Sequence, residues 1–168
     1  MICASSAQKR NSLKTNTKPA QKGPVFFEIS HERYNKTMKK ALLVLDMQNV
    51  CVGKHSAPMF KYNKEALILN VNKEIASRKH DLVVYIRTVL GKNSILRFLS
   101  PIKVIEGTPE ANLVDGLEIV SGHILSKVRG NAFTNPQLLK LLREHEIEEV
   151  ELGGLDGGGC VSLTGLAA

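Results

Sequence analysis

The chain has 168 residues, of which 43% are hydrophobic and 23% charged, and its formal net charge is +7. This length suits one domain with a sizeable core, and no apolar run approaches the roughly 18 residues that a membrane helix needs, so we expect no membrane partner. The three cysteines are odd in number and widely spaced, which argues against a disulfide framework and predicts a reducing compartment, the cytoplasm.

The excess positive charge lies at the start of the chain. Residues 1–40 carry nine Lys or Arg and two Glu, whereas the fourteen basic and fourteen acidic side chains of residues 41–168 cancel. Because residues 41–168 carry no net charge, they give little support for nucleic-acid binding, and we expect no such partner. A nucleic-acid binder with a basic tail remains an alternative function for the chain.

We expect residues 1–37 to form a disordered basic leader, because residues 1–24 hold no acidic and few large apolar side chains. Three interpretations compete: a transit-like presequence, a basic interaction tail, or sequence upstream of the natural start. We favour the third, because Met38 directly precedes the first strong strand.

The rest of the chain alternates between strand and helix patterns. Residues 41–45 are a continuous apolar run, which predicts a buried strand ending at Asp46. Residues 64–79 have helical apolar spacing, and residues 82–86 predict a second buried strand. Residues 89–117 read as irregular because proline and glycine interrupt them.

Two further strands follow. A short strand at residues 123–125 leads to Lys127, and Asn135 can cap the next helix. Residues 150–153 predict the fourth strand. This alternation predicts an α/β domain over residues 38–168, with a doubly wound, mostly parallel sheet flanked by helices.

Cys160 lies where the fourth strand, after the glycine-rich loop 155–159, passes to a helix. A thiol at a helix N-terminus feels the positive end of the helix dipole, so we expect its pKa to be lowered. The glycines leave room for a substrate carbonyl, and free backbone N–H groups can hold an oxyanion. The alternative for an isolated cysteine is a small buried hydrophobe.

Three reactive side chains follow the ends of predicted strands: Asp46, Lys127 and Cys160. Because the carboxyl ends of parallel strands meet at one edge, we expect all three in the same crevice. A carboxylate there can take the thiol proton and later pass it to a leaving amine, while an ammonium supports the charges. The pattern predicts covalent catalysis by cysteine.

Four segments occur in a set order: LLVLDMQN at 42–49, GTPEA at 107–111, SKVRGNAF at 126–133, and GLDGGGCV at 154–161 with Thr164 following. Together they resemble, in order and approximate spacing, the motifs of the isochorismatase-like cysteine hydrolases, the family related to nicotinamidase and carbamoylsarcosine amidase. The resemblance covers residues 41–168.

The resemblance implies a triad of Cys160, Asp46 and Lys127, and an oxyanion hole formed by the backbone N–H groups of Asp156 and Cys160. It also implies a cis peptide bond between Leu155 and Asp156. Because isochorismatases proper lack the cysteine, the resemblance implies an amidase that cleaves a C–N bond of a small amide through an acyl-enzyme. It implies no metal and no organic cofactor.

Further candidates for contacts with the amide substrate are Gln48, Arg87 and Phe133, with Arg87 suited to a substrate carboxylate. The chain also departs from the family pattern. Val50-Cys51 stands where the family often has aspartate and phenylalanine, so we expect an aromatic wall of the pocket to be missing. The family's nicotinamidase metal motif is absent, which argues against nicotinamide as substrate.

Family members continue past the helix of Cys160 through two further βα units. We therefore expect the domain to be incomplete, with residues 150–153 forming an edge strand and the activity of this chain uncertain. The alternative function is a catalytically inactive α/β module that binds a small ligand or a protein partner. The sequence leaves the substrate and a homo-oligomeric state open.

Overall fold

The computed structural model describes residues 38–77, 82–95, 100, 102 and 104–168. The predicted leader, residues 1–37, lies outside the described residues, as do residues 78 and 79 at the end of the predicted helix 64–79. The described chain forms a parallel four-stranded sheet with the order β3-β2-β1-β4. Its strands are β1 (Lys40–Leu45), β2 (Leu82–Thr88), β3 (Ile124–Lys127) and β4 (Glu149–Gly154).

The central strand is β1, which pairs with both β2 and β4. The five residues that follow Lys40 in β1 are at most 3% exposed, because the sheet is covered on both faces. A strand buried on both faces needs apolar side chains at every position, which explains the unbroken apolar run in the sequence. The predicted doubly wound, mostly parallel α/β fold is confirmed.

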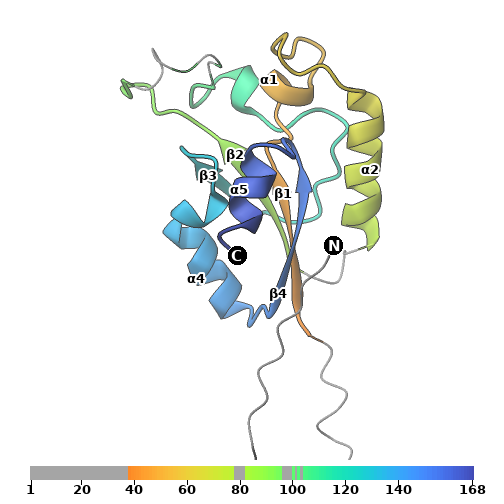
Figure 1. The fold of residues 1–168 in the computed structure, drawn as a ribbon, viewed down its shortest axis with the longest axis vertical. Helices are drawn as coiled ribbons and strands as arrows, with labels where there is room; N and C mark the ends of the chain where they lie inside the picture. Colours follow the sequence, from red (N-terminus) through yellow and green to blue (C-terminus); the bar gives the residue numbers. More distant parts are fainter. Residues whose placement is uncertain (1–37, 78–81, 96–99, 101, 103) are drawn as a thin grey trace, which may run out of the picture. The chain divides into compact units, whose positions relative to one another are not determined.

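Helices cover the two faces of the sheet (Figure 1). On one face, α2 (Lys64–Ser77) packs Val71 and Ile75 against β1 and β2. On the other face lie α4 (Pro136–Glu144), which buries Leu138 and Leu142, and the short α5 (Cys160–Gly165). No helix of the described residues is both long and apolar enough to cross a membrane.

Short elements complete the domain. A one-turn helix, α1 (Asn49–Val52), follows β1, and two 3₁₀ turns lie at η2 (Pro109–Ala111) and η3 (Ala132–Thr134). As predicted, Asn135 caps α4, because its side chain accepts a hydrogen bond from the Gln137 N–H.

The strand register brings the candidate residues together. Asp46 directly follows β1, while Thr88 and Lys127 are the last residues of β2 and β3 and are paired in register. The site therefore lies at the carboxyl edge of the sheet. Among the described residues β4 pairs only with β1 and forms an edge of the sheet, as expected for residues 150–153.

Candidate active site

Asp46 adopts an uncommon backbone conformation at the end of β1. Its φ of 54° lies in the left-handed region, which non-glycine residues adopt rarely. Two backbone hydrogen bonds hold it, one from its N–H to the Ile86 carbonyl and one from the Gln48 N–H to its carbonyl, each of 2.8 Å. The Asp46 side chain is only 6% exposed. Such a conformation, fixed on both sides, is typical of functional positions.

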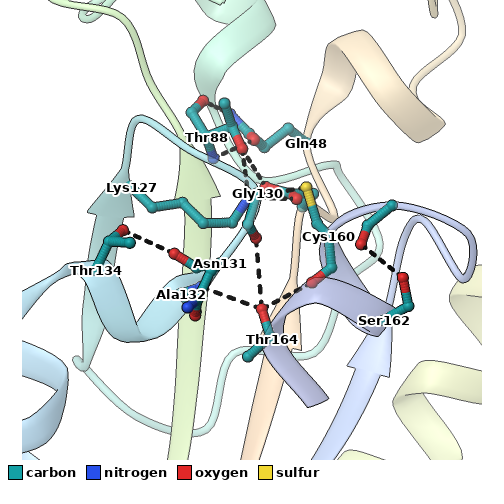
Figure 2. Close-up of polar contacts among 12 residues, drawn as sticks. Gln48, Thr88, Lys127, Gly130, Asn131, Ala132, Thr134, Cys160, Ser162 and Thr164 are labelled. Atoms are coloured by element: carbon teal, nitrogen blue, oxygen red, sulfur yellow. Dashed lines mark hydrogen bonds and ion pairs between the residues drawn. The ribbon is translucent and has the colours of Figure 1, made fainter. Parts of the chain in front are cut away.

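Lys127 supplies a fully buried ammonium group. Its side chain is 0% exposed, and Nζ lies 2.8 Å from Oδ2 of Asp46 and 3.1 Å from Sγ of Cys160. Figure 2 shows the lysine side chain running from β3 to the cysteine. A buried ammonium is tolerated only when charged and polar acceptors surround it, so Lys127 and Asp46 depend on each other.

The turn after β4 sets the position of Cys160. Gly154 has a φ of 115°, and a Cβ atom there would lie 2.1 Å from the carbonyl oxygen of Leu45. Only glycine fits this close approach of the two backbones. The peptide bond between Leu155 and Asp156 is cis, as the resemblance implied. The chain then enters α5 at Cys160.

Thr164 fastens α5 to the segment that follows β3. Its fully buried hydroxyl donates a 2.7 Å hydrogen bond to the Cys160 carbonyl and accepts one of 3.1 Å from the Ala132 N–H (Figure 2). Lys127 lies five residues before Ala132. The threonine therefore fixes the distance between the helix that carries the thiol and the segment that carries the ammonium.

The pKa of the Cys160 thiol is raised, contrary to the expectation of a lowered value. Burial is the largest cause, and the charge of Asp46 and its hydrogen bond to the thiol add to it; the Lys127 ammonium acts in the opposite direction but does not prevail. The expectation was wrong because the burial of the sulfur and the nearby Asp46 carboxylate outweigh the dipole of α5, which has only six residues. The thiol of the free protein therefore holds its proton more tightly than an ordinary cysteine does.

A cavity of about 480 Å³ opens beside these groups. Asp46 and Cys160 both line it, and most of its wall is apolar. Its lining residues are Asp46, Gln48, Cys51, Met59, Phe60, Thr88, Leu90, Ser100, Ile102, Val104, Val128, Leu155, Asp156, Gly159 and Cys160. Cys51 lines the wall at the position where the family often has an aromatic residue, and Phe60 supplies an aromatic side chain elsewhere in the wall.

The three predicted substrate contacts are placed differently. Gln48 borders the cavity, but both of its amide donors bind backbone carbonyls, those of Thr88 and Ala111. Arg87 and Phe133 do not line the cavity, and Phe133 packs in the core beside α4. Side chains alternate along a strand, so Arg87 and Thr88 cannot both face the site.

Sequence reasoning missed two residues of the site. Thr88 could have been found by the signal that singled out Asp46 and Lys127, because it too ends a strand of the parallel sheet. Phe60 lies in the loop after α1, where no motif or periodicity marks it.

The backbone hydrogen bonds of the turn before α5 use some of its N–H groups and leave others without a partner among the described residues. The carbonyl of Asp156 accepts hydrogen bonds from the N–H groups of Gly159 and Val161, while the N–H groups of Asp156 and Cys160 bind no other described residue. Among the described residues no three His, Cys, Asp or Glu side chains lie close enough to hold a metal ion.

A comparison with models of protein families shows to which family this chain belongs. The model of the isochorismatase domain matches residues 40–168, which is most of the chain. The chain belongs to the isochorismatase family. This confirms the resemblance seen in the four sequence segments and places Asp46, Lys127 and Cys160 within the isochorismatase domain. Among curated proteins, none matches the sequence in a direct comparison.

Solved structures of hydrolases share the fold. An isochorismatase-like hydrolase from Alkaliphilus metalliredigens is 27% identical with a TM-score of 0.67, over 77% of this chain and 74% of that one. The pyrazinamidase of Pyrococcus horikoshii, solved with zinc, is 27% identical with a TM-score of 0.63, over 77% and 78%. The N-carbamoylsarcosine amidase from Thermoplasma acidophilum is 24% identical with a TM-score of 0.62, over 78% and 76%.

Proposed function

We propose that this protein is a cysteine hydrolase that cleaves the C–N bond of a small amide. The observation that carries the proposal is the cluster beside the cavity, where the Lys127 ammonium lies 2.8 Å from the Asp46 carboxylate and 3.1 Å from the Cys160 sulfur. Membership of the isochorismatase family and similarity to amidase structures support the same reaction type.

The first half of the reaction forms a thioester. Sγ of Cys160 attacks the amide carbon while the thiol proton passes to the Asp46 carboxylate, which the raised thiol pKa requires. The N–H groups of Asp156 and Cys160 hold the resulting oxyanion. The intermediate collapses as the C–N bond breaks, and the amine leaves with the proton from Asp46.

The second half regenerates the thiol. A water molecule gives a proton to Asp46 and attacks the thioester carbon, which again places negative charge on the carbonyl oxygen. The C–S bond then breaks, the carboxylic acid leaves, and the sulfur recovers its proton. The hydrogen bonds of Lys127 stabilise the Asp46 carboxylate and the Cys160 sulfur in turn.

The cavity wall favours an uncharged acyl group. Beyond the reacting groups, the wall is formed mainly by aliphatic and aromatic side chains, among them Phe60, Leu90 and Val104. The described lining residues include no Lys, Arg or His that could pair with a substrate carboxylate. We therefore propose amides with an apolar acyl group rather than amides of acidic compounds. A nucleic-acid partner forms no part of this function, and we propose the cytoplasm as its location.

Ammonia release from a panel of aliphatic, aromatic and carboxylate-bearing amides tests the proposal. We expect hydrolysis of apolar amides, loss of activity in Cys160→Ala, and retained activity in Cys3→Ala, which lies outside the matched domain. Mass spectrometry of the intact protein should show an acyl adduct on the unmodified sequence (the parent chain), and the Cys160→Ala variant should lack this adduct. A parent chain that binds amides but releases no ammonia and forms no adduct would support the non-catalytic binding module instead.

A further inference from the structure

Thr88 lies between the two charged groups of the site. Its hydroxyl donates a 2.8 Å hydrogen bond to Oδ1 of Asp46 and accepts one of 2.6 Å from Nζ of Lys127. An ammonium can only donate, so the hydroxyl hydrogen must point to the carboxylate. One hydroxyl therefore bridges the carboxylate that takes the proton and the ammonium that faces the sulfur.

We propose that Thr88 is a positioning residue for the reaction, an inference that rests on the proposed function. Lys127 has three N–H donors, and each has its own acceptor: Oδ2 of Asp46, Oγ1 of Thr88 and Sγ of Cys160. Together the three acceptors hold Nζ in position and satisfy every donor of the buried ammonium. Without the Thr88 hydroxyl, one N–H of this buried ammonium faces no acceptor, so Nζ is free to shift away from its place against the sulfur.

The carboxylate is fixed in the same way. Oδ2 of Asp46 accepts from Lys127 and Oδ1 accepts from Thr88, so the plane of the carboxylate is held from both sides. The base that takes the thiol proton must lie within hydrogen-bond reach in a defined orientation. Thr88 thus acts on Cys160 through both of its partners and not by touching the substrate carbon.

Gln48 holds the backbone of Thr88 in place. Its fully buried amide donates to the Thr88 carbonyl at 3.0 Å and accepts from the Thr88 N–H at 2.8 Å, while a further bond of 2.9 Å reaches the Ala111 carbonyl. Figure 2 shows the Gln48 amide directly against Thr88. Gln48 therefore binds both the N–H and the carbonyl of Thr88, and this fixed backbone restrains the position of the Thr88 hydroxyl.

Two substitutions of Thr88 separate the effect of its hydroxyl from the effect of its side-chain shape. Thr88→Val keeps the branched shape but removes the hydroxyl, and Thr88→Ser keeps the hydroxyl. Since a small misplacement of reacting groups can cost about 100-fold, we expect kcat to fall about 30- to 100-fold in the valine variant and KM to change less than about twofold. The serine variant should recover kcat to within about fivefold of the parent, because the bridging hydroxyl is present.

Alkylation of Cys160 by iodoacetamide, followed on the Cys160 peptide by mass spectrometry, gives a readout that needs no turnover. Lys127 lowers the pKa of the thiol through its hydrogen bond and charge. If Thr88 holds the ammonium against the sulfur, the valine variant alkylates more slowly than the serine variant at the same mildly alkaline pH. Melting temperatures of the variants show whether each one folds.

The outcomes distinguish the two proposals. A parent chain that hydrolyses amides, with a valine variant whose kcat and alkylation rate match the parent, overturns the role of Thr88 and leaves the hydrolase intact. Equal losses in the valine and serine variants also overturn it, because the hydroxyl is then not the cause. If the parent chain releases no ammonia, the proposed hydrolase function is wrong. The alkylation rates alone then show whether Thr88 positions Lys127 against Cys160. Should the valine variant not fold, Thr88→Ala against Thr88→Ser makes the same comparison.

Discussion

The ammonium of Lys127 donates a 3.1 Å hydrogen bond to the sulfur of Cys160, although the two residues are 33 positions apart in the chain. The same ammonium is paired with Asp46, whose charge acts on the thiol in the opposite sense. The proton on Cys160 is therefore controlled by two neighbours of opposite charge, and each can be removed separately.

Replacing Asp46 by Asn should separate thiol reactivity from catalysis. The Asp46 charge raises the pKa of Cys160, so its removal lowers that pKa and increases the thiolate fraction at neutral pH. We expect faster alkylation by iodoacetamide, while amide hydrolysis falls at least about 100-fold because the base is lost. Cys51 provides an internal control, since burial raises its pKa to about 12 and it should stay unmodified. Slower alkylation of Asp46→Asn would contradict this account.

Removing the cation should destabilise the fold. Lys127→Met leaves the buried Asp46 carboxylate without its ion-pair partner, which typically costs about 3–5 kcal/mol of unfolding free energy. Adding Asp46→Asn to the same chain removes the stranded charge, so the double variant should be more stable than Lys127→Met alone. Urea unfolding measures both values. Additive losses would show that the two side chains do not interact in solution.

Thr164 should matter for stability as well as for activity. Thr164→Val leaves the buried Ala132 N–H without its acceptor and the Cys160 carbonyl without its side-chain donor, which costs about 1–3 kcal/mol. Hydrolysis should fall as α5 loses its link to the segment after β3. Thr164→Ser, which keeps the hydroxyl, is the matched control, and equal melting temperatures for the two variants would refute the prediction.

Two glycines of one turn should respond differently to alanine. At Gly154 the new Cβ would meet the Leu45 carbonyl oxygen at 2.1 Å in a backbone conformation that alanine adopts poorly, so we expect a loss above about 2 kcal/mol. At Gly157 a Cβ would meet nothing within 4 Å, so Gly157→Ala should leave the unfolding free energy nearly unchanged. Chemical denaturation of both variants gives the comparison, which fails if Gly157→Ala is the more harmful.

A cation placed on the cavity wall should change the substrate preference. Val128 lines the cavity and is 52% exposed, so a longer polar side chain fits there without disturbing the core. Val128→Arg should raise kcat/KM about two- to fivefold for amides that bear a carboxylate, as expected for a partly exposed ion pair. Val128→Gln, which is long but neutral, should show no such gain. The same gain in both variants would show that charge is not the cause.

Much of this architecture could be predicted from local sequence. The unbroken apolar runs of β1 and β2 predicted buried parallel strands, and the strand ends then predicted that Asp46, Lys127 and Cys160 would meet. That step needs only the direction of the strands, because parallel strands end at one edge.

The features that sequence reasoning missed depend on distances that no local pattern contains. The bond between Gln48 and Thr88 joins residues 40 positions apart and exists only in the register of β1 and β2. The raised pKa of Cys160 likewise depends on burial and on the nearness of Asp46, which outweigh a helix of one and a half turns. The hydrophobic pattern and the strand order thus predicted which three side chains form the site, whereas the pKa of Cys160 depends on the tertiary structure.

The raised pKa of Cys160 also bears on damage by oxidants. Hydrogen peroxide attacks thiolates far faster than thiols, so a sulfur that keeps its proton until a substrate arrives is a poor target. The burial and the Asp46 charge that raise the pKa of the thiol therefore also slow its oxidation. Under oxidative stress, the substrate-free protein should lose activity more slowly than cysteine enzymes whose catalytic sulfur is a thiolate at rest.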